Sequence, residues 1–340
     1  MKSKYIDAMY YSNKLDILED IFGSKNIKVE LECLTVNDKN YPIIDDVIIL
    51  LDPAQYPESL SKRIKVDKSI IHTVDMEFAE DIQFTFGVEW QEFSEIMPEH
   101  KEEFAQYFDL INLCDLKNKR ICDLGCGIGR WGYFLKEQCK ELILVDFSEA
   151  IFVARNNLKD DENILYFMGD LRRLPLRDDF VDFLFCIGVL HHLPWSALEE
   201  VRSLRKYTSQ ILIYLYYALD NRPFYFRVLF MFATRIRLQA SSVKNSHFRN
   251  LFSWIGVLFF YLPFILLGSI LRSPGRSHLV PLYESYHSKT LERIRQDVYD
   301  RFFTRIEQRF TREEIMTLKD TISNVIVSNQ LPYWHFLVKR

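Results

Sequence analysis

The clearest chemical pattern in this 340-residue chain is a set of acidic side chains and glycines that follow short apolar runs. Asp123 stands within the apolar run 121–124, and Gly125, Gly127 and Gly129 follow it directly. A loop of residues without a Cβ can approach a ligand closely, and a helix beginning at Arg130 would direct its free N–H groups into the same crevice. The spacing differs from the G-x-G-x-x-G loop of dinucleotide-binding folds, and an adjacent carboxylate favours a cationic ligand over a pyrophosphate.

Further acids follow the next two apolar runs. Asp146 ends the run 141–146, at the point beyond Gly125 where nucleotide-binding folds place a carboxylate that accepts the ribose hydroxyls. Asp170 follows the run 163–168. Because the carboxyl ends of parallel strands meet at one edge of a sheet, we expect the three carboxylates to surround one nucleoside.

Two histidines, His191 and His192, follow the apolar run 180–187 at the same edge. An imidazole there could accept a proton from an acceptor hydroxyl during a transfer reaction. The alternative is that a histidine at this point only bonds backbone carbonyls.

The segment Asp-Leu-Gly-Cys-Gly-Ile-Gly (123–129) resembles the first motif of class I S-adenosylmethionine-dependent methyltransferases. The resemblance extends over roughly residues 115–217, because three further features follow in the family's order. They are the acid that binds the ribose (Asp146), the acid that contacts the adenine (Asp170) and the segment 187–194 that leaves the fourth strand. The sequence of the segment 187–194 is close to that of ubiquinone-biosynthesis-type and other small-molecule methyltransferases. The resemblance implies S-adenosyl-L-methionine as cofactor. The implied cofactor-binding residues are Asp123, Gly125, Cys126, Gly127, Gly129, Asp146, Phe147, Asp170, Leu171 and Ile187.

The alternation of apolar runs and helical patterns predicts an α/β, Rossmann-like fold with a seven-stranded, mostly parallel sheet. We expect strands at 121–124, 141–146, 163–167, 180–186 and 210–217, and an antiparallel hairpin at 321–328 and 333–338. Ser196 with Glu199 and Thr311 with Glu314 have the spacing of helix capping boxes. The expected division is a small β unit (1–55), a linker and cofactor-covering segment (56–115), the core (116–217), a helical insertion between the fifth and sixth strands (218–310) and the completion of the core (311–340).

The segment 1–55 resembles the zinc-ribbon-like segment that precedes some methyltransferases, in a degenerate form. Only Cys33 stands where a cluster of ligands would be needed, so we predict no metal. The aromatic stretch 84–93 contains Trp90 in a Phe-Gly-x-x-Trp pattern, which resembles a segment that folds over the cofactor. Packing of the linker against the core is the alternative.

The stretch 251–271 carries no charged side chain and is long enough to span a bilayer. The strands before and after it must join one sheet, which excludes a single crossing. Three interpretations remain: a helical hairpin that bends near Pro263 and is buried as a lid, a patch that dips into a membrane interface, or a dimer interface.

Within the insertion, Tyr283, Tyr286 and His287 are candidate substrate residues together with Trp90, and Asp297 and Asp300 share a helix face. Leu291, Ile294, Val298, Phe302 and Ile306 predict the buried stripe of that helix. The arginines of the same segment indicate a solvated mixed-charge surface rather than a phosphate clamp. They are Arg293, Arg295, Arg301 and Arg305.

The net charge of −4 argues against DNA as a partner and weakly against RNA. The six cysteines form no C-x-x-C pair, and the segment 1–20 lacks a signal-peptide pattern, so we expect a cytoplasmic protein or one peripheral to the inner face of a membrane. The expected function is methyl transfer to a small hydrophobic or lipid-linked acceptor. The alternatives are an RNA methyltransferase and a cofactor-binding scaffold without turnover.

Overall fold

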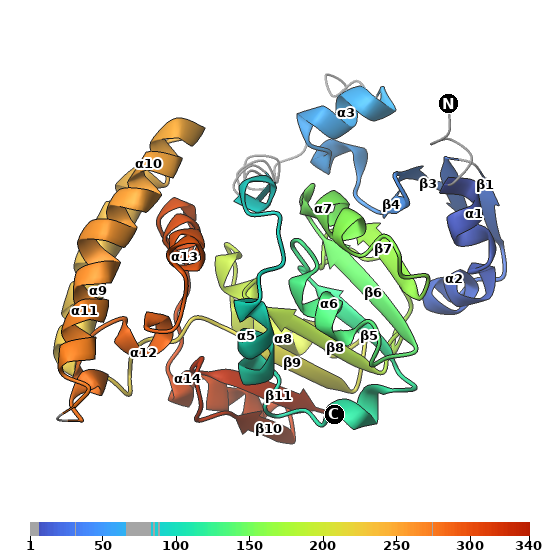
Figure 1. Cartoon of the computed structure of the whole chain (residues 1–340). Helices are drawn as coiled ribbons and strands as arrows, with labels where there is room; N and C mark the ends of the chain where they lie inside the picture. Colours follow the sequence, from blue (N-terminus) through green and yellow to red (C-terminus); the bar gives the residue numbers. More distant parts are fainter. Residues whose placement is uncertain (1–6, 31, 66–82, 84–85, 88, 274) are drawn as a thin grey trace.

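A computed structural model describes residues 7–30, 32–65, 83, 86–87, 89–273 and 275–340, with a mixed sheet at the centre (Figure 1). Within these residues the sheet has 11 strands in the order β1-β2-β3-β4-β7-β6-β5-β8-β9-β11-β10. The strands from β7 onward in this order form the predicted core, in which β11 runs antiparallel to β9 and β10. Their bounds are β5 (Arg120–Leu124), β6 (Glu141–Asp146), β7 (Ile164–Met168), β8 (Phe183–Ile187), β9 (Gln210–Tyr214), β10 (Asn324–Val327) and β11 (His335–Lys339). The mostly parallel sheet with a C-terminal antiparallel hairpin is therefore confirmed.

The N-terminal strands continue this sheet instead of forming a layer of their own. β1 (Ile27–Glu30), β2 (Cys33–Val36) and β3 (Lys39–Ile44) make an antiparallel meander. β4 (Val47–Ile49) pairs with β3 on one side and, in parallel, with β7 on the other. All three β4 side chains are fully buried, because an apolar strand without alternation requires cover on both faces.

Helices cover both faces of the sheet and create two hydrophobic cores. On β6 the side chains alternate between them, with Leu142 and Leu144 in one core and Ile143 and Val145 in the other. The first core contains α3 (Glu58–Ile64), α5 (Glu99–Tyr107), α6 (Arg130–Leu135) and α7 (Ala150–Asn157). The second contains α2 (Leu15–Phe22), α8 (Ala197–Leu204) and α14 (Arg312–Met316). The remaining short elements are α1 (Asp7–Ser12) and the 3₁₀ turns η1 (Pro53–Gln55), η3 (Leu113–Leu116), η4 (Leu190–His192) and η7 (Thr317–Asp320).

The predicted helix starts carry the expected caps. Thr311 and Glu314 form a complete capping box at α14. At α8 the Ser196 hydroxyl accepts from the Glu199 backbone N–H, while the Glu199 side chain pairs with Arg202 instead of closing the box.

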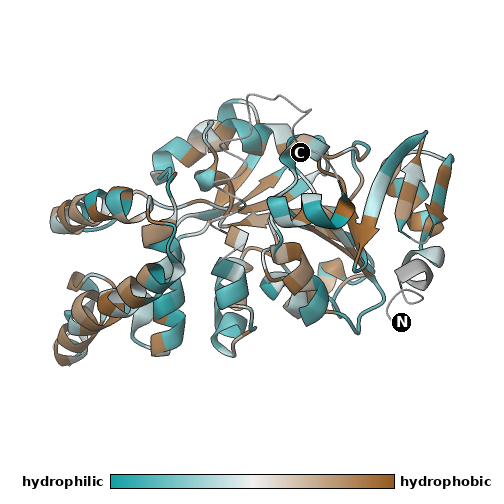
Figure 2. Ribbon diagram, turned by 90° about the horizontal axis from the view of Figure 1, so that it is seen from above, coloured by the Kyte–Doolittle hydropathy of each residue, from teal (hydrophilic) through white to brown (hydrophobic). Residues whose placement is uncertain are grey.

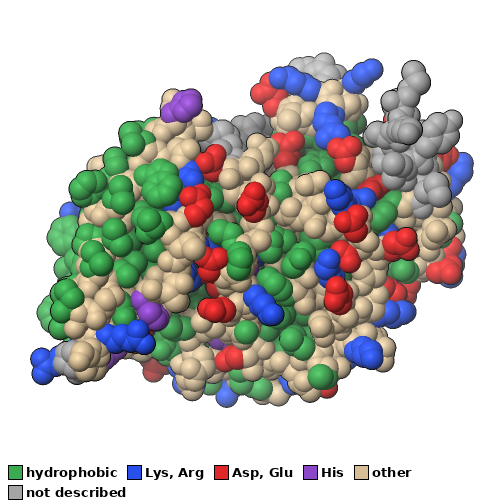
Figure 3. Space-filling model, viewed as in Figure 1, with side chains coloured by type: hydrophobic (Ala, Val, Ile, Leu, Met, Phe, Trp, Pro, Cys, Tyr) green, Lys and Arg blue, Asp and Glu red, His purple; other side chains and the backbone are tan. Residues whose placement is uncertain are grey.

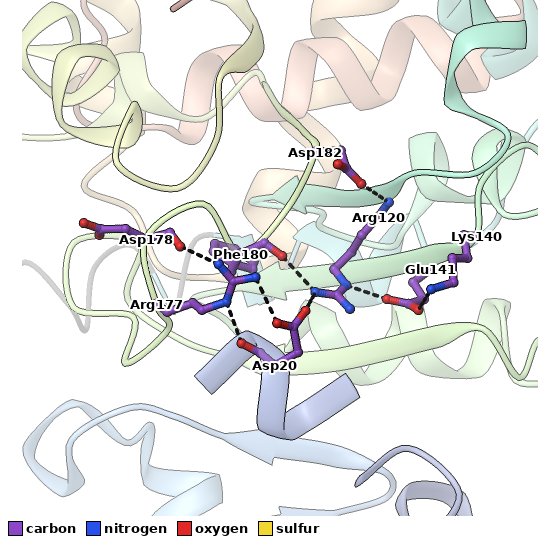
Figure 4. Close-up of polar contacts among 8 residues, drawn as sticks. All are labelled: Asp20, Arg120, Lys140, Glu141, Arg177, Asp178, Phe180 and Asp182. Atoms are coloured by element: carbon purple, nitrogen blue, oxygen red, sulfur yellow. Dashed lines mark hydrogen bonds and ion pairs between the residues drawn. The ribbon is translucent and has the colours of Figure 1, made fainter. Parts of the chain in front are cut away.

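A network of charges ties α2 to the amino end of the parallel strands (Figure 4). Arg120 at the start of β5 donates to Asp20 of α2 at 2.5 Å and also pairs with Glu141 of β6. Arg177 donates to both the side chain and the backbone carbonyl of Asp20, at 3.0 and 2.7 Å. The network therefore fixes the N-terminal unit at the end of the sheet that lies opposite the glycine loop.

Residues 218–310 leave the sheet and return to it at one point. The Ala218 backbone N–H donates to the Phe310 carbonyl at 2.8 Å, and Tyr217 forms a parallel bridge with Phe310. Both ends of the insertion therefore lie on the same side of the molecule. Its elements are α9 (Phe224–Ala240), α10 (Ser246–Gly256), the π turn η5 (Val257–Tyr261), α11 (Leu262–Ile270), the 3₁₀ turn η6 (Ser277–Leu279), α12 (Tyr283–Tyr286) and α13 (Leu291–Phe303).

The helical hairpin at Pro263, one of the three interpretations of the stretch 251–271, does not form. A continuous helix runs from Ser246 to Ile270 through α10, η5 and α11. Proline removes an N–H and crowds the preceding turn, and the π turn directly before Pro263 widens the helix at that point. The prediction failed because a local widening of the helix can accommodate proline without a reversal of the chain.

This helix and α9 present apolar side chains to solvent. Among the described helices, Ser246–Ile270 is long and apolar enough to cross a membrane. Only 28% of its most apolar 18-residue window is buried inside the protein. Both α9 and α10 pack on α13. In Figure 2 the helices of the insertion lie beyond one side of the sheet, and in Figure 3 hydrophobic side chains gather on the same side of the molecule. We call the following exposed side chains the apolar surface: Phe224, Met231, Phe232 and Leu238 of α9, and Leu251, Phe259, Leu266 and Ile270 of α10–α11.

Candidate functional site

The glycine loop lies at the carboxyl end of β5 and leads into α6. Gly125, Gly127 and Gly129 have φ angles of +82°, +54° and +77°, which L-residues rarely adopt. A Cβ at Gly125 would lie 2.3 Å from a Val189 methyl carbon, and one at Gly127 would lie 3.2 Å from the Trp90 ring. The loop is therefore closed on one side by the β8 exit and on the other by the ring of Trp90.

Asp146 at the tip of β6 holds this loop in place. One carboxylate oxygen accepts from the Gly127 backbone N–H at 2.8 Å, and the other accepts from the Ser148 N–H and hydroxyl at 2.8 and 2.7 Å. Burial raises the pKa of Asp146 despite these donors. The carboxylate still borders the cavity described below.

Asp170, after β7, is held by a residue from the N-terminal part of the chain. Its carboxylate accepts from the Gln55 side-chain amide at 2.9 Å and from the Arg172 backbone N–H at 3.0 Å. The Gln83 amide in turn donates to the Gln55 and Phe147 carbonyls at 2.8 and 3.2 Å. The N-terminal segment thus helps to build this side of the site, which strand patterns alone could not indicate.

Asp123 lies behind the glycine loop and is almost fully buried, at 1% exposure. Neither carboxylate oxygen has a hydrogen-bond partner among the described residues. Burial, and next the nearby Asp146 carboxylate, raise the pKa of Asp123 well above its usual range. A buried carboxyl group without a partner beside the loop fits a cationic group in the crevice above it.

A cavity of about 780 Å³ connects these elements with the insertion. Most of the predicted site residues lie in its wall: Gly125, Cys126, Gly127, Asp146, Phe147, Asp170, Leu171, Ile187, His192, Trp90, Tyr286 and His287. Four others are not among its lining residues: Asp123, Gly129, His191 and Tyr283. Gly129 faces Leu158 and Ala154, and Tyr283 packs on Gly268, so the contacts of both are internal.

Comparison with known proteins agrees with this geometry. Residues 121–207 match a family model described as a methyltransferase domain, and this range contains the glycine loop, Asp146, Asp170 and both histidines. The domain belongs to the class I S-adenosylmethionine-dependent methyltransferases. Its cofactor is S-adenosylmethionine.

The chain is also similar over part of its length to a curated protein, the tRNA U34 carboxymethyltransferase of Campylobacter hominis. The two are 28% identical over 107 residues, which cover 30% of this chain and 38% of that protein. Similar solved structures include a SAM-dependent methyltransferase from Aquifex aeolicus, with 18% identity, 37% of this chain and 71% of that chain covered, and a TM-score of 0.33. Another is a methyltransferase from Methanococcus maripaludis, with 13% identity, 76% and 94% covered, and a TM-score of 0.39.

The residues present fit S-adenosylmethionine. Asp146 would accept from ribose hydroxyls and Asp170 would lie toward the adenine. Asp123 lies behind the loop, where an ammonium or sulfonium group would favour its ionised form and offset the rise in its pKa. S-adenosylmethionine supplies a methyl group on a positively charged sulfur, so the protein need only align the acceptor, exclude water and remove a proton where the acceptor carries one.

His192 borders the cavity and is oriented by the insertion. Its Nδ1 lies 2.9 Å from the Ile306 carbonyl oxygen. A carbonyl only accepts, so Nδ1 carries the proton and Nε2 keeps a lone pair that can take a proton. The ring also lies near Phe86, at 5.4 Å between ring centroids.

His191 is a packing residue in this structure. It is fully buried, its ring stacks on Tyr216 at 3.8 Å between centroids, and neither ring nitrogen has a partner among the described residues. Burial lowers the pKa of His191 well below its usual range, so the ring is neutral. The doubled histidine in the sequence did not show which ring would face the site.

The end of the cavity that lies away from the glycine loop is apolar. Its wall there comes from α9 and from α10–α11, through Leu229, Phe230, Ile236, Phe252, Phe260 and Phe264. The cofactor-binding loop and this apolar end belong to one continuous space. Of the expected cofactor-covering segment, Phe86 and Trp90 face that space, whereas residues 84, 85 and 88 lie outside the described part of the chain.

The arginines of α13 differ from the solvated surface that the sequence indicated. Arg293 and Arg295 are 5% and 7% exposed. Arg293 pairs with Glu103 and Asp297, and Arg295 pairs with Glu92 and Glu292. Of the predicted buried stripe, Ile294, Val298 and Phe302 are buried, but Leu291 is 43% exposed.

Several cavity residues were missed by sequence reasoning. Arg130 begins α6 and lies over the Trp90 and Trp131 rings, at 5.1 and 4.5 Å from their centroids. Tyr214 and Tyr216 line the cavity at the end of β9, and their alternate spacing at a strand tip was a usable signal. Glu89, next to Trp90, also lines the cavity, and no sequence pattern predicted this.

Proposed function

We propose that this chain transfers the methyl group of S-adenosylmethionine to a small hydrophobic or lipid-linked acceptor. The observation that carries the proposal is the continuity of the cofactor crevice with the apolar end of the cavity. Such walls lower the free energy of an apolar acceptor and exclude water from the reacting groups. These apolar walls provide few hydrogen-bond partners for a polar sugar.

We assign proton removal to His192. Its Nε2 holds the lone pair of a ring that borders the cavity, and the Ile306 carbonyl fixes the ring through Nδ1. The assignment applies to a hydroxyl or other protonated acceptor, because only such a group must lose a proton.

We further propose that the chain takes its acceptor from a membrane surface, as a peripheral protein at the cytoplasmic face. The side chains of the apolar surface include Phe259 and Ile270, at 71% and 73% exposure. Arg272 and Arg276 follow the end of α11 and are exposed, and such a basic border suits anionic headgroups. α10 packs on α13 and α11 packs on α12, so the long helix lies along the protein and its opposite side is free to contact a bilayer.

RNA is the second candidate acceptor, because the curated relative is named for a tRNA reaction. A net charge of −4 gives little general attraction to phosphates. The same assay can decide between the two acceptor classes.

The test is transfer of a tritiated methyl group from S-adenosylmethionine in detergent solution, with a total lipid extract in one reaction and bulk tRNA in another. We expect label in the organic phase and none in the RNA. The variant Phe260→Asp, in the cavity wall, should lose this transfer. Leu258→Asp, in the same turn and similarly exposed but outside the cavity wall, should retain it. Label in RNA alone would overturn the lipid acceptor, and binding without any transfer would indicate a scaffold.

A further inference from the structure

Arg301 of α13 is a cationic side chain in the cavity wall that forms no ion pair with the described residues around it. It makes no hydrogen bond or ion pair with any residue in the described part of the chain. A guanidinium carries five N–H donors in a planar fork that matches carboxylate and phosphate oxygens. In a partly buried setting such a group is costly unless something else satisfies it.

The carboxylates near Arg301 are each engaged elsewhere. Asp297 pairs with Arg293, and Glu307 pairs with Arg309 at 2.6 Å. Asp300 accepts from the Tyr216 hydroxyl at 2.7 Å. None of these three lies within ion-pair distance of Arg301, and Glu307 attracts it only at longer range, so the N–H donors of Arg301 remain available to a ligand.

Three tyrosines accompany Arg301 in the cavity wall: Tyr216, Tyr261 and Tyr286. Tyr261 and Tyr286 come from η5 and α12, and their rings meet edge to face at 5.0 Å between centroids. Burial raises the pKa of all three hydroxyl groups, so they remain protonated at neutral pH. The Tyr216 proton is already donated to Asp300, so Tyr261 and Tyr286 are the tyrosines that can donate to a ligand.

A second polar group points to a ligand independently. Gln296 of α13 also lines the cavity and is 2% exposed. Neither its amide nitrogen nor its amide oxygen has a hydrogen-bond partner among the described residues. A buried side-chain amide without hydrogen-bond partners is rare in folded proteins. A bound ligand that supplies those partners would explain it.

The position of this group links the two ends of the cavity. Tyr216 contacts Asp300 on one side and the His191 ring on the other, next to His192. The aromatic walls of the apolar end begin at Phe260 and Phe264, beside Tyr261. An acidic group held here would lie between the proposed base and the apolar end.

We propose that Arg301, with the hydroxyls of Tyr261 and Tyr286 and the amide of Gln296, binds an oxyanion of the acceptor, which is therefore an acidic amphiphile carrying a phosphate or carboxylate group. The inference rests on the proposed function and deepens it. The apolar tail occupies the end of the cavity between α9 and α10–α11, and the acidic group sets how deeply the acceptor enters.

The test measures binding of chain-length-matched probes to the full chain saturated with S-adenosylhomocysteine. The probes are decyl phosphate, decanoate and decanol, each below its critical micelle concentration, with inorganic phosphate as a tail-free probe. At least one of the two acids should bind one site per chain at least tenfold more tightly than decanol. The better acid identifies the group, and inorganic phosphate should bind far more weakly.

Arg301→Met should remove this preference while decanol and S-adenosylhomocysteine still bind, which also shows that the variant is folded. The matched variant is Arg305→Met. Arg305 lies four residues further along the chain, beyond the end of α13, where its side chain is exposed and does not line the cavity. Arg305→Met should bind like the wild type. Equal binding of acids and decanol by the wild type, or an unchanged preference in Arg301→Met, would overturn the inference.

Failure of this inference and failure of the proposed function give different results. Methyl transfer to extracted lipid that is equally fast in Arg301→Met would leave the proposed function standing without the anion site. A lost acid preference in Arg301→Met, with no methyl transfer to any lipid, would leave the site standing without that function.

Discussion

The Nδ1 atom of His192 donates to the carbonyl oxygen of Ile306 across 2.9 Å, which joins the exit of β8 to the segment that follows α13. The helical insertion thereby fixes the tautomer of a ring in the catalytic domain. One contact thus connects the cofactor-binding core with the part of the chain that supplies the acceptor end of the cavity.

For His192→Ala we expect methyl transfer to fall by about 10²–10⁴-fold, the usual contribution of a general base. S-adenosylhomocysteine should bind as it does to the wild type, since the ring is not needed to hold the loop. Single-turnover transfer measures the first quantity and equilibrium dialysis the second. Full activity in the variant would remove His192 from the reaction.

For Asp146→Asn we expect cofactor binding to weaken by about 1–3 kcal/mol, because a charged acceptor is lost and the Gly127 and Ser148 contacts are altered. Equilibrium dialysis with labelled S-adenosylmethionine would show this as a higher Kd. Asp160→Asn is the matched control, since Asp160 is exposed beyond α7. A wild-type Kd for Asp146→Asn would refute its assignment.

Asp123 should make the stability of the ligand-free protein dependent on pH. Its pKa is raised in the folded state, so above about pH 4 the unfolded chain has lost a proton that the folded chain still holds. The free energy of unfolding therefore falls as the pH rises from about 4 toward the folded pKa. Chemical denaturation at pH 5 and 6, just above the unfolded pKa, should show a smaller fall in the free energy of unfolding for Asp123→Asn than for the wild type. Equal slopes would show that Asp123 is ionised in the folded protein.

Gly125→Ala should destabilise the fold more than Gly188→Ala. Both glycines have a φ of +82°, which costs a non-glycine residue about 1–3 kcal/mol. Only Gly125 would place its Cβ against Val189, whereas nothing lies within 4 Å of a Cβ at Gly188. Urea denaturation measures the difference, and similar losses for the two variants would mean that Val189 moves aside freely.

The double variant Phe259→Asp/Ile270→Asp should reduce co-flotation with vesicles that contain anionic lipid. Both side chains belong to the apolar surface, and charges there oppose insertion into the interface. Ile326→Asp is a control, because Ile326 is exposed on β10, outside the insertion. Unchanged flotation would contradict the membrane assignment, and a change from dimer to monomer in sedimentation would assign the surface to a homodimer instead.

The core was predictable because its signals are local. Each parallel strand is a short apolar run, and the acids at 146 and 170 stand where those runs end, so periodicity and spacing located them. The glycine loop was equally visible, since glycines at alternate positions between an apolar run and a helical pattern are typical of a ligand-binding turn. All of these signals lie within a few neighbouring positions of the chain.

The rest of the site depends on contacts between distant segments. Gln55 reaches Asp170 across 115 residues, and Arg293 reaches Glu103 across 190. No local pattern reports such a contact, and an arginine paired in the interior has the same sequence neighbourhood as one in solvent. The bend expected at Pro263 failed for a related reason, since the π turn that accommodates it leaves no composition signal.

Isothermal titration of the full chain with S-adenosylmethionine and with S-adenosylhomocysteine tests the central claim most directly. The cavity around the glycine loop predicts saturable binding of each ligand at one site per chain, retained in the acceptor-end variant Phe260→Asp. The absence of heat with either ligand, where a control protein binds both, would contradict the assignment on which every other inference depends.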